Sequence, residues 1–540
     1  MKLLQISSAE KILPDVDYSG LKEINTLTSL KGERVSYQIL YLNEGGKRFK
    51  VSVKDAHGMN VIIRKVGNVQ VDFPGHKKEM DDYYLKKTPG IYPDYLEPIE
   101  DGMILANDYN HVIYITSEVP ENIESGKYKL QIMFDAEADD EHLVKEIEVN
   151  VLNAVLPETD FTYTQWFHSD CIASVYKYEL MSDEHWLMIE KFVKTAVRTG
   201  VNMILTPVFT PALDTAIGHE RPTFQLVGVS YIDGKYSFDF RNLKKWIDMC
   251  LRCGIKKFEI SHLFTQWGAR KTPKIIVNGE RKFGWDVDAD SKMYLEFLDE
   301  FLPALTDFLK SEMVYENSYF HISDEPNFER DFEHYKKCYD FIVKYIPAEK
   351  LTDAMSEYEF IERGYAKNPI VKSESVEDFF NRDMRDIWTY TCCEPAGGFY
   401  SNRFITMPLG RTRILGIQLY KYGIKGFLHW GYNFYYTAGS KKVIDPFRVT
   451  DGGEQFPAGD SFSVYPGADG PLESIRSEAF YQGLQDRGAC CLLESLIGRE
   501  ETLKVIDADG KITMSEYPRS NDGILGIRER INLKIEEVVK

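Results

Sequence analysis

The sequence predicts a multidomain α/β protein, with an N-terminal β-sandwich followed by a (β/α)8, or TIM, barrel. At 540 residues the chain is too long for one hydrophobic core. Before about residue 155, apolar and polar residues alternate with the period of two that is typical of strands. Beyond that point, short apolar runs alternate with amphipathic helical stripes, which is typical of a parallel barrel. We therefore expect two domains, residues 1–156 and 157–540.

Several runs in the first domain have one apolar face. In residues 34–43, the side chains of Val35, Tyr37, Ile39 and Tyr41 share one side of a strand. Clusters of Gly, Asn and Asp separate such runs at short intervals, as in a β-sandwich. The other runs are residues 48–54, 126–135 and 142–152.

The second domain contains eight candidate strands with helices between them. The first long helix is predicted to begin after the N-cap Ser182 and to end at Gly200. The candidate strands are residues 162–167, 201–209, 255–264, 318–324, 351–355, 386–391, 426–431 and 461–465. The further candidate helices are residues 241–252, 291–310, 330–345, 410–422 and 474–493.

Long insertions follow the second and third candidate strands. Each contains a hairpin signal, Asp233–Gly234 in the first and Asn278–Gly279 in the second. Loops that follow barrel strands lie on the catalytic face, so these insertions are candidate pocket walls. Surface decoration is the alternative interpretation.

Composition narrows the partners and the compartment. Asp plus Glu total 84 against 65 Lys plus Arg, a formal net charge of −19, which disfavours nucleic acid and anionic membranes as partners. We find no signal peptide and no apolar stretch that spans a bilayer. The eight Cys show no disulfide framework, so we expect a cytoplasmic protein, with a homo-oligomer left open.

No motif indicates a cofactor. Cys250 and Cys253 form a C-x-x-C pair without a second matching pair, which argues against zinc. No phosphate loop or nucleotide fingerprint is present. We expect neither a metal nor a cofactor.

The adjacent acidic residues Asp324 and Glu325 are the strongest catalytic signal. They end the candidate strand 318–324, directly before Pro326, and therefore belong at the barrel mouth. Two close carboxylates repel, so one holds its proton more tightly, as a general acid requires. A pair of ordinary surface charges is the alternative interpretation.

The adjacency of Asp324 and Glu325 also limits the mechanisms that the pair could use. Most glycosidases flank the scissile bond with two separate carboxylates. Neighbouring residues approach from the same side and must divide the work differently. One protonates the leaving oxygen, and the other orients a nucleophile of the substrate, such as a 2-acetamido carbonyl.

The acidic pair and several motifs together resemble glycoside hydrolase family 123, whose members are retaining β-N-acetylgalactosaminidases that use substrate assistance. The likeness runs over nearly the whole chain. The matching motifs are SAEKILPD (8–15), GERVSYQ (32–38), GFLHWGYN (426–433), GDSFSVYPG (459–467) and SIRSE (474–478).

The resemblance implies distinct roles for the two carboxylates. Glu325 would be the general acid/base. Asp324 would hold the acetamido N–H and stabilise the oxazolinium-like intermediate. If the sugar lacked an acetamido group, another carboxylate would have to act as the nucleophile, and Glu394 and Asp353 are the nearest strand-end candidates.

Other strand-end residues are candidate substrate contacts. The alternative is core packing for Trp430 and Tyr390, and a hydrogen-bonded structural role for His168, Asp170 and Trp267. Trp430 would form a floor under the sugar ring, Asn433 would bind a hydroxyl, and Tyr390 would assist the acetamido carbonyl. Further candidates that line the rim or close the pocket are His168, Asp170, Trp267 and Tyr465.

The leading hypothesis is a retaining β-N-acetylgalactosaminidase that hydrolyses terminal or internal β-linked GalNAc by substrate-assisted catalysis. The substrate partner is then a glycan or glycoconjugate. The alternatives are a glycosidase for another hexosamine or a neutral sugar, and a carbohydrate-binding protein without activity.

Overall fold

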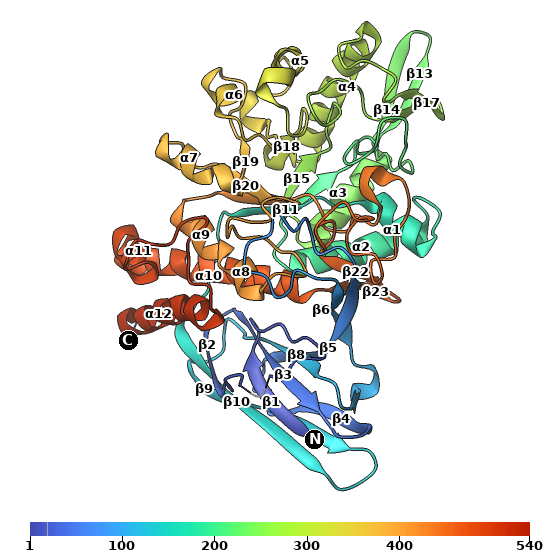
Figure 1. Cartoon of the computed structure of the whole chain (residues 1–540). Helices are drawn as coiled ribbons and strands as arrows, with labels where there is room; N and C mark the ends of the chain where they lie inside the picture. The colour runs from blue at the N-terminus through green and yellow to red at the C-terminus, as the bar shows by residue number, and fades with distance from the viewer. Residues whose placement is uncertain (19, 540) are drawn as a thin grey trace.

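The computed structural model describes residues 1–18 and 20–539 and begins with a β-rich region. Two sheets face each other, with strand orders β1-β3-β8-β5-β6 and β2-β10-β9-β4-β7 (Figure 1). Neighbouring strands are antiparallel except for the parallel pair β2 and β10. The strands are β1 (Lys2–Ser7), β2 (Thr26–Lys31), β3 (Arg34–Leu42), β4 (Lys47–Lys54), β5 (Asn60–Val71), β6 (Gly90–Pro98), β7 (Met103–Ala106), β8 (His111–Glu118), β9 (Gly126–Ala136) and β10 (His142–Val155).

The predicted apolar face of β3 is confirmed. Tyr37, Ile39 and Tyr41 are buried and pack in one core with residues of the facing sheet, such as Phe49. The opposite face of β3 is also covered, because Leu40 packs against the second region of the chain. The alternation of side chains along the strand predicted only the buried face that carries Tyr37, Ile39 and Tyr41.

The second region is built on a parallel sheet that forms a half-barrel, so the multidomain α/β class is confirmed. Its strand order is β18-β15-β12-β11-β21-β20-β19. Residues 351–354 lie between the two edge strands of this sheet. Leu351 forms a parallel bridge with Phe320 of β18, and Ala354 forms a parallel bridge with Ile370 of β19. The strands are β11 (Thr162–Gln165), β12 (Met203–Thr206), β15 (Lys257–Ile260), β18 (Ser318–Phe320), β19 (Ile370–Lys372), β20 (Trp388–Thr391) and β21 (Gly426–His429).

Two strand predictions were wrong. Strand β19 was missed because it has only three residues, too few to show a periodic pattern. Residues 461–465 are not part of the parallel sheet. Instead β22 (Val464–Gly467) pairs antiparallel with β23 (Gly470–Glu473). An isolated apolar run predicts a strand but not its partner.

The predicted helices are confirmed, except that residues 410–422 are divided between two short helices, Leu409–Arg413 and Leu415–Lys421. Ser182 caps α2 by accepting a hydrogen bond from the His185 N–H at 3.2 Å. No helix in the described part of the chain is long and apolar enough to span a membrane. The helices are α1 (Ser169–Tyr176), α2 (Asp183–Arg198), α3 (Arg241–Cys253), α4 (Lys292–Ser311), α5 (Phe328–Ile342), α6 (Tyr358–Glu362), α7 (Val376–Asn381), α8 (Leu409–Arg413), α9 (Leu415–Lys421), α10 (Ile475–Ile497), α11 (Arg499–Ile506) and α12 (Asn521–Val539).

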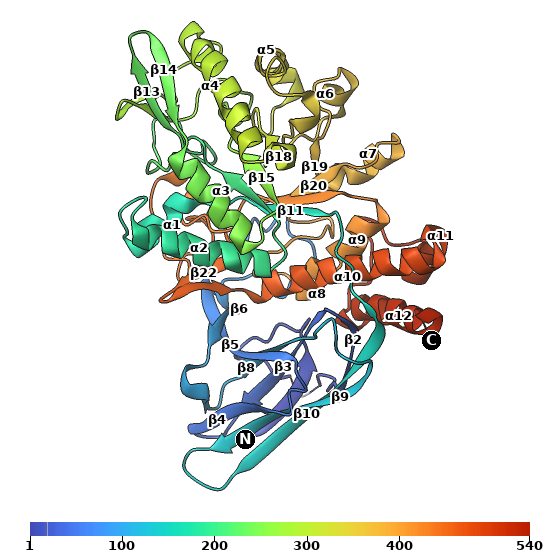
Figure 2. The same cartoon turned by 180° about the vertical axis from the view of Figure 1, so that it is seen from behind.

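Both predicted hairpins are present in the two insertions. β13 (Gly228–Ile232) pairs with β14 (Lys235–Asp239), and β16 (Ile275–Val277) pairs with β17 (Glu280–Phe283). The turn residues of each hairpin have positive φ angles, as expected for Asp–Gly and Asn–Gly turns. The hairpins project from one end of the parallel sheet (Figures 1 and 2).

Helix α10 joins the two regions. It lies across the base of the parallel sheet, on the side of the sandwich (Figure 2). Arg476, near its start, is fully buried and donates to the Asp94 carboxylate of β6 at 2.7 and 2.8 Å. The Tyr465 hydroxyl donates to the same carboxylate at 2.5 Å. Neither charge of this pair reaches water, so each depends on the other.

We expect Asp94→Ala to lower the free energy of unfolding by about 3–5 kcal/mol, because Arg476 would be left charged and unpaired in the interior. Urea unfolding of the full chain measures the change. Glu146→Gln, which removes the surface partner of Lys129, is the control and should have little effect. Equal behaviour of the two variants would contradict the prediction.

Candidate active site

The acidic pair lies where the chain turns away from β18. Ile322 and Ser323 are fully buried, and the half-exposed Asp324 and Glu325 follow them. The Glu325 N–H donates to the Ala354 carbonyl at 3.0 Å. Glu325 has a φ of +43°, a left-handed conformation that non-glycine residues seldom adopt. This turn breaks the strand alternation, so adjacent carboxylates can approach the same space.

The surroundings of the Asp324 carboxyl group favour its neutral form. Burial raises its pKa well above the usual range, and the negative charge of Glu325 raises it further, while the nearby His321 acts in the opposite direction. No residue among 1–18 and 20–539 donates a hydrogen bond to this carboxyl group. Asp324 is therefore a partly exposed acceptor to which no described side chain or backbone N–H donates.

The Glu325 carboxylate is oriented by Tyr390. The buried Tyr390 hydroxyl donates to Glu325 Oε1 at 2.5 Å. Burial and the Glu325 charge raise the pKa of Tyr390 well above its usual range, so this hydroxyl stays protonated and acts as a donor. Tyr390 was a predicted site residue, and the structure brings it to the pair.

Lys372, at the end of β19, adds a positive charge near Glu325. Burial lowers the pKa of Lys372, but the charges of Glu325 and Glu394 raise it by more, so the ammonium group stays charged. Its Nζ lies 3.4 Å from Glu394 Oε2. Lys372 was not predicted, because the strand that carries it was not recognised.

A buried ionic network lies beneath the pair. His321 Nε2 is 2.6 Å from Glu259 Oε1, and His321 Nδ1 is 3.3 Å from Asp353 Oδ1. Burial lowers the pKa of His321, but the hydrogen bonds to Asp353 and Glu259 outweigh it and raise the pKa to about 10. The imidazole is therefore a cation at neutral pH, held between two carboxylates. Glu259 also accepts from the Trp166 indole N–H at 2.7 Å.

Asp353 was predicted as an alternative nucleophile, but both of its carboxylate oxygens accept hydrogen bonds from the protein. It is buried, and the Tyr335 hydroxyl donates to its Oδ2 at 2.6 Å. Its Oδ1 accepts from the Ile322 N–H at 3.0 Å and contacts His321. This carboxylate fixes the backbone just before the acidic pair rather than facing a substrate.

Trp267 brings an exposed aromatic ring close to the pair. Its backbone N–H donates to the Asp324 carbonyl at 2.8 Å, and 49% of the residue is exposed. The next residue, Gly268, has a φ of +104°, and a Cβ there would lie 2.4 Å from Asp331 Cγ. Only glycine allows the loop to approach α5 this closely.

Trp430 follows β21 and is half-buried. Its indole N–H donates to Asp460 Oδ2 at 2.8 Å. Burial raises the pKa of the fully buried Asp460 to about 7, although the Trp430 hydrogen bond opposes the shift. Asp460 thus fixes the orientation of Trp430, which keeps part of its surface available to a ligand.

Three other predicted substrate contacts are buried and bind other protein groups instead. Asn433 is fully buried and clamps the backbone of His168, accepting its N–H at 2.8 Å and donating to its carbonyl at 3.1 Å. Asp170 forms a buried ion pair with Arg221, with Oδ1 2.6 Å from Nη2. Burial lowers the pKa of His168 to about 3, so its ring is neutral.

Tyr465 is not brought to the pair. It is fully buried at the boundary with the sandwich, where it donates to Asp94. Sequence reasoning also missed Glu259, Asp460 and Arg221. Glu259 lies in the apolar run 255–264 that was interpreted as a strand, and a charged residue inside such a run is the signal that could have identified it. Asp460 directly precedes the predicted strand 461–465.

A carboxyl with a raised pKa, a second carboxylate oriented by a tyrosine and an exposed tryptophan suit acid-catalysed cleavage of a glycosidic bond. Within the described residues, no cluster of His, Cys, Asp and Glu could hold a metal ion. The fold and the site define the class of glycoside hydrolases. Residues 166–493 match the model of the catalytic domain of glycoside hydrolase 123, and the chain belongs to this family.

A solved structure has the same fold over nearly the whole chain. It is a family 123 glycoside hydrolase from Clostridium perfringens, described in terms of glycolipid glycan hydrolysis, with a TM-score of 0.74 and 16% identity over 99% of this chain and 98% of that one. An endo-β-1,4-mannanase from Thermotoga petrophila has a TM-score of 0.34 and 13% identity, over 62% of this chain and 78% of that one. No curated protein matches the chain.

We expect Asp460→Asn to change the pH dependence of stability. The folded-state pKa of about 7 lies above the unfolded value of about 3.9, so the wild type loses stability as pH rises from about 4 to about 7. The loss is on the order of 4 kcal/mol. Asn still accepts from Trp430 but does not titrate. Urea unfolding at several pH values should show the wild-type curve falling relative to the variant, and parallel curves would contradict the prediction.

Proposed function

We propose that this glycoside hydrolase is a retaining β-N-acetylgalactosaminidase that cleaves terminal or internal β-linked GalNAc by substrate-assisted catalysis. One observation carries the proposal. The unsatisfied Asp324 carboxyl lies next to Glu325, which Tyr390 already orients. The two carboxylates come from one strand end, so they cannot flank a glycosidic bond from opposite sides.

In the first step, the acetamido oxygen of the substrate attacks C1 of the same sugar. Glu325 gives its proton to the leaving oxygen as the C1–O bond breaks. Asp324 accepts a hydrogen bond from the acetamido N–H and stabilises the positive charge of the oxazolinium that forms. In the second step, Glu325 takes a proton from water, which attacks C1, reopens the ring and retains the configuration.

The protonation of Asp324 depends on whether substrate is bound. In the free enzyme, burial and the Glu325 charge favour a proton on Asp324. An acetamido N–H donated to Asp324 would favour its anionic form, because hydrogen bonds to a carboxylate stabilise the charge. Substrate binding would thus favour the anionic form of Asp324 that its proposed role requires.

The alternative mechanism needs a separate enzymatic nucleophile. Asp353 is bound by Tyr335 and by the backbone before the pair. Glu394 is more than half exposed and pairs with Lys372. Neither is a free carboxylate facing Glu325, which favours a nucleophile supplied by the sugar. A glycosidase for another hexosamine would use the same chemistry.

We also propose that residues 157–540 form a complete (β/α)8 catalytic domain after a sandwich of residues 1–156. In this arrangement residues 351–354 serve as the fifth strand and β19 as the sixth. The two parallel bridges at Leu351 and Ala354 support this proposal. The natural substrate would be a glycan or glycoconjugate, as in the Clostridium perfringens relative that acts on glycolipid glycans.

We expect Glu325→Gln to lower kcat by about 10²–10⁴-fold on substrates with poor leaving groups, because the general acid is lost. The first step should be much less affected with a dinitrophenyl leaving group, which departs without protonation. Steady-state and burst kinetics on both substrates measure the difference. If Glu394→Gln removed activity and Glu325→Gln did not, the assignment would be wrong.

We expect Asp324→Asn to weaken binding of a GalNAc-derived thiazoline, which mimics the oxazolinium, because the carboxylate proposed to accept the acetamido N–H and stabilise the positive charge is lost. Wild-type activity on nitrophenyl β-GalNAc but not on nitrophenyl β-galactoside is the companion measurement. Equal activity on both sugars would refute substrate assistance.

A further inference from the structure

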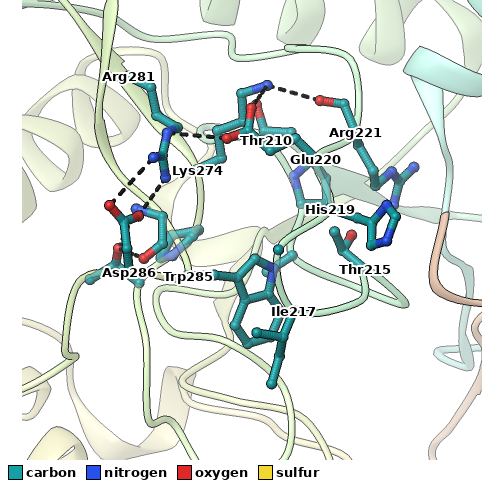
Figure 3. A pocket seen from close by; sticks show the side chains of 16 residues that line it. Thr210, Thr215, Ile217, His219, Glu220, Arg221, Lys274, Arg281, Trp285 and Asp286 are labelled. Carbon is teal, nitrogen blue, oxygen red and sulfur yellow. Dashed lines mark hydrogen bonds and ion pairs between the residues drawn. The ribbon is translucent and has the colours of Figure 1, made fainter. Parts of the chain in front are cut away.

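A cavity separate from the acidic pair opens between the two insertions (Figure 3). Its volume is about 290 Å³, near the lower end of small-molecule pockets. One wall comes from residues 210–221, after β12, and the other from residues 272–286, after β15. An antiparallel bridge between Thr210 and Lys274 holds the walls together.

Trp285 provides a large apolar surface on this cavity. It is half-buried, yet its ring contacts no other aromatic ring and belongs to no hydrophobic cluster in the described residues. Ile217, which is 79% exposed, lines the same cavity. A partly exposed indole is well suited to stack on the C–H face of a sugar ring.

The charged groups around the cavity are held in ion pairs. Glu220 lies 2.9 Å from Lys274 Nζ and 3.1 Å from Arg281 Nε, and Arg281 Nη1 lies 2.5 Å from Asp286 Oδ1 (Figure 3). These two cations and two carboxylates form a neutral array of fixed donors and acceptors, and the fifth charged residue of the lining, Arg221, is paired with the buried Asp170. Neutral hydroxyl groups, which both donate and accept, suit such an array better than an anion does.

Thr210 adds an unsatisfied group to the cavity lining. It is only 2% exposed, and its Oγ1 has no hydrogen-bond partner among the described residues. A buried hydroxyl without a partner is unfavourable, and such groups are usually satisfied by protein or ordered water. Thr210 therefore leaves a donor and acceptor unused at the cavity wall, an observation independent of Trp285.

The cavity walls continue into the loops around the acidic pair. The Asp214 N–H donates to Gln266 Oε1 at 2.7 Å, which joins the two insertions. The next residue, Trp267, binds the backbone of Asp324. The cavity and the pair thus belong to one connected set of loops beyond the strand ends.

We propose that this cavity is a subsite for a neutral monosaccharide unit of the glycan, other than the unit cleaved at Asp324–Glu325. The sugar ring stacks on Trp285, and its hydroxyls bind Thr210 and the Glu220–Arg281 pair. The proposal rests on the proposed glycosidase function, which supplies the glycan.

Calorimetric binding to the Glu325→Gln variant tests the subsite without turnover. One probe is a neutral tetrasaccharide ending in β-linked GalNAc, and the second is the trisaccharide that lacks this terminal sugar. We expect both to bind, and Trp285→Ala to weaken each by about tenfold. Tyr109→Ala, which removes an aromatic ring that is 62% exposed on the sandwich, should have no effect.

Kinetics supply the second measurement. Trp285→Ala should lower kcat/KM about tenfold more for the tetrasaccharide than for nitrophenyl β-GalNAc. Thr210→Val should weaken binding of the trisaccharide without lowering Tm, because it removes an unpaired buried hydroxyl.

The outcomes separate the two proposals. Trisaccharide binding that depends on Trp285, without cleavage of any GalNAc glycoside, would support the subsite and refute the proposed function. Cleavage with binding that Trp285→Ala leaves unchanged would overturn the subsite alone. Preferential binding of a sulfated disaccharide would overturn the assignment to a neutral sugar.

Discussion

A protonated imidazole enclosed by two carboxylates lies beneath the acidic pair and holds together the strand ends that carry it. His321 contacts Glu259 of β15 and Asp353 of residues 351–354, so one cation joins three neighbouring segments of the sheet. Removing His321 would leave two buried carboxylates without their cation, which costs far more than an ion pair contributes at a surface. Because Asp353 also accepts the Ile322 N–H, the network sets the position from which Asp324 and Glu325 emerge.

The same principle of buried pairing recurs where the two regions meet. Asp94 of the sandwich neutralises Arg476 of α10, and Glu478 on the same helix lies close to Arg34 and Arg64 of the sandwich. These charges are removed from water only when both regions are folded against α10. The sandwich therefore packs tightly against the second region and stabilises it. For the same reason both faces of β3 are buried.

Sequence patterns predicted much of this organisation and failed at identifiable places. The caps, helices and Asp–Gly and Asn–Gly hairpins depend on local backbone preferences, so they could be predicted. Strand β19 is too short to show a period, and residues 461–465 pair with a segment that no local pattern identifies. In the site, Trp267 and Tyr390 were predicted and lie at the pair, whereas Lys372 and Asp460 were missed with their surroundings.

The sequence by itself determined that two carboxylates follow a strand closely and that, as neighbours, they must divide their roles, since covalent adjacency is independent of the fold. Tertiary structure alone decided which groups surround them. Burial raised the pKa of Asp324, Tyr390 approached Glu325 from another strand, and Asp353 became a structural carboxylate. These effects depend on distances between residues far apart in the chain, and desolvation and charge interactions exist only once those distances are fixed.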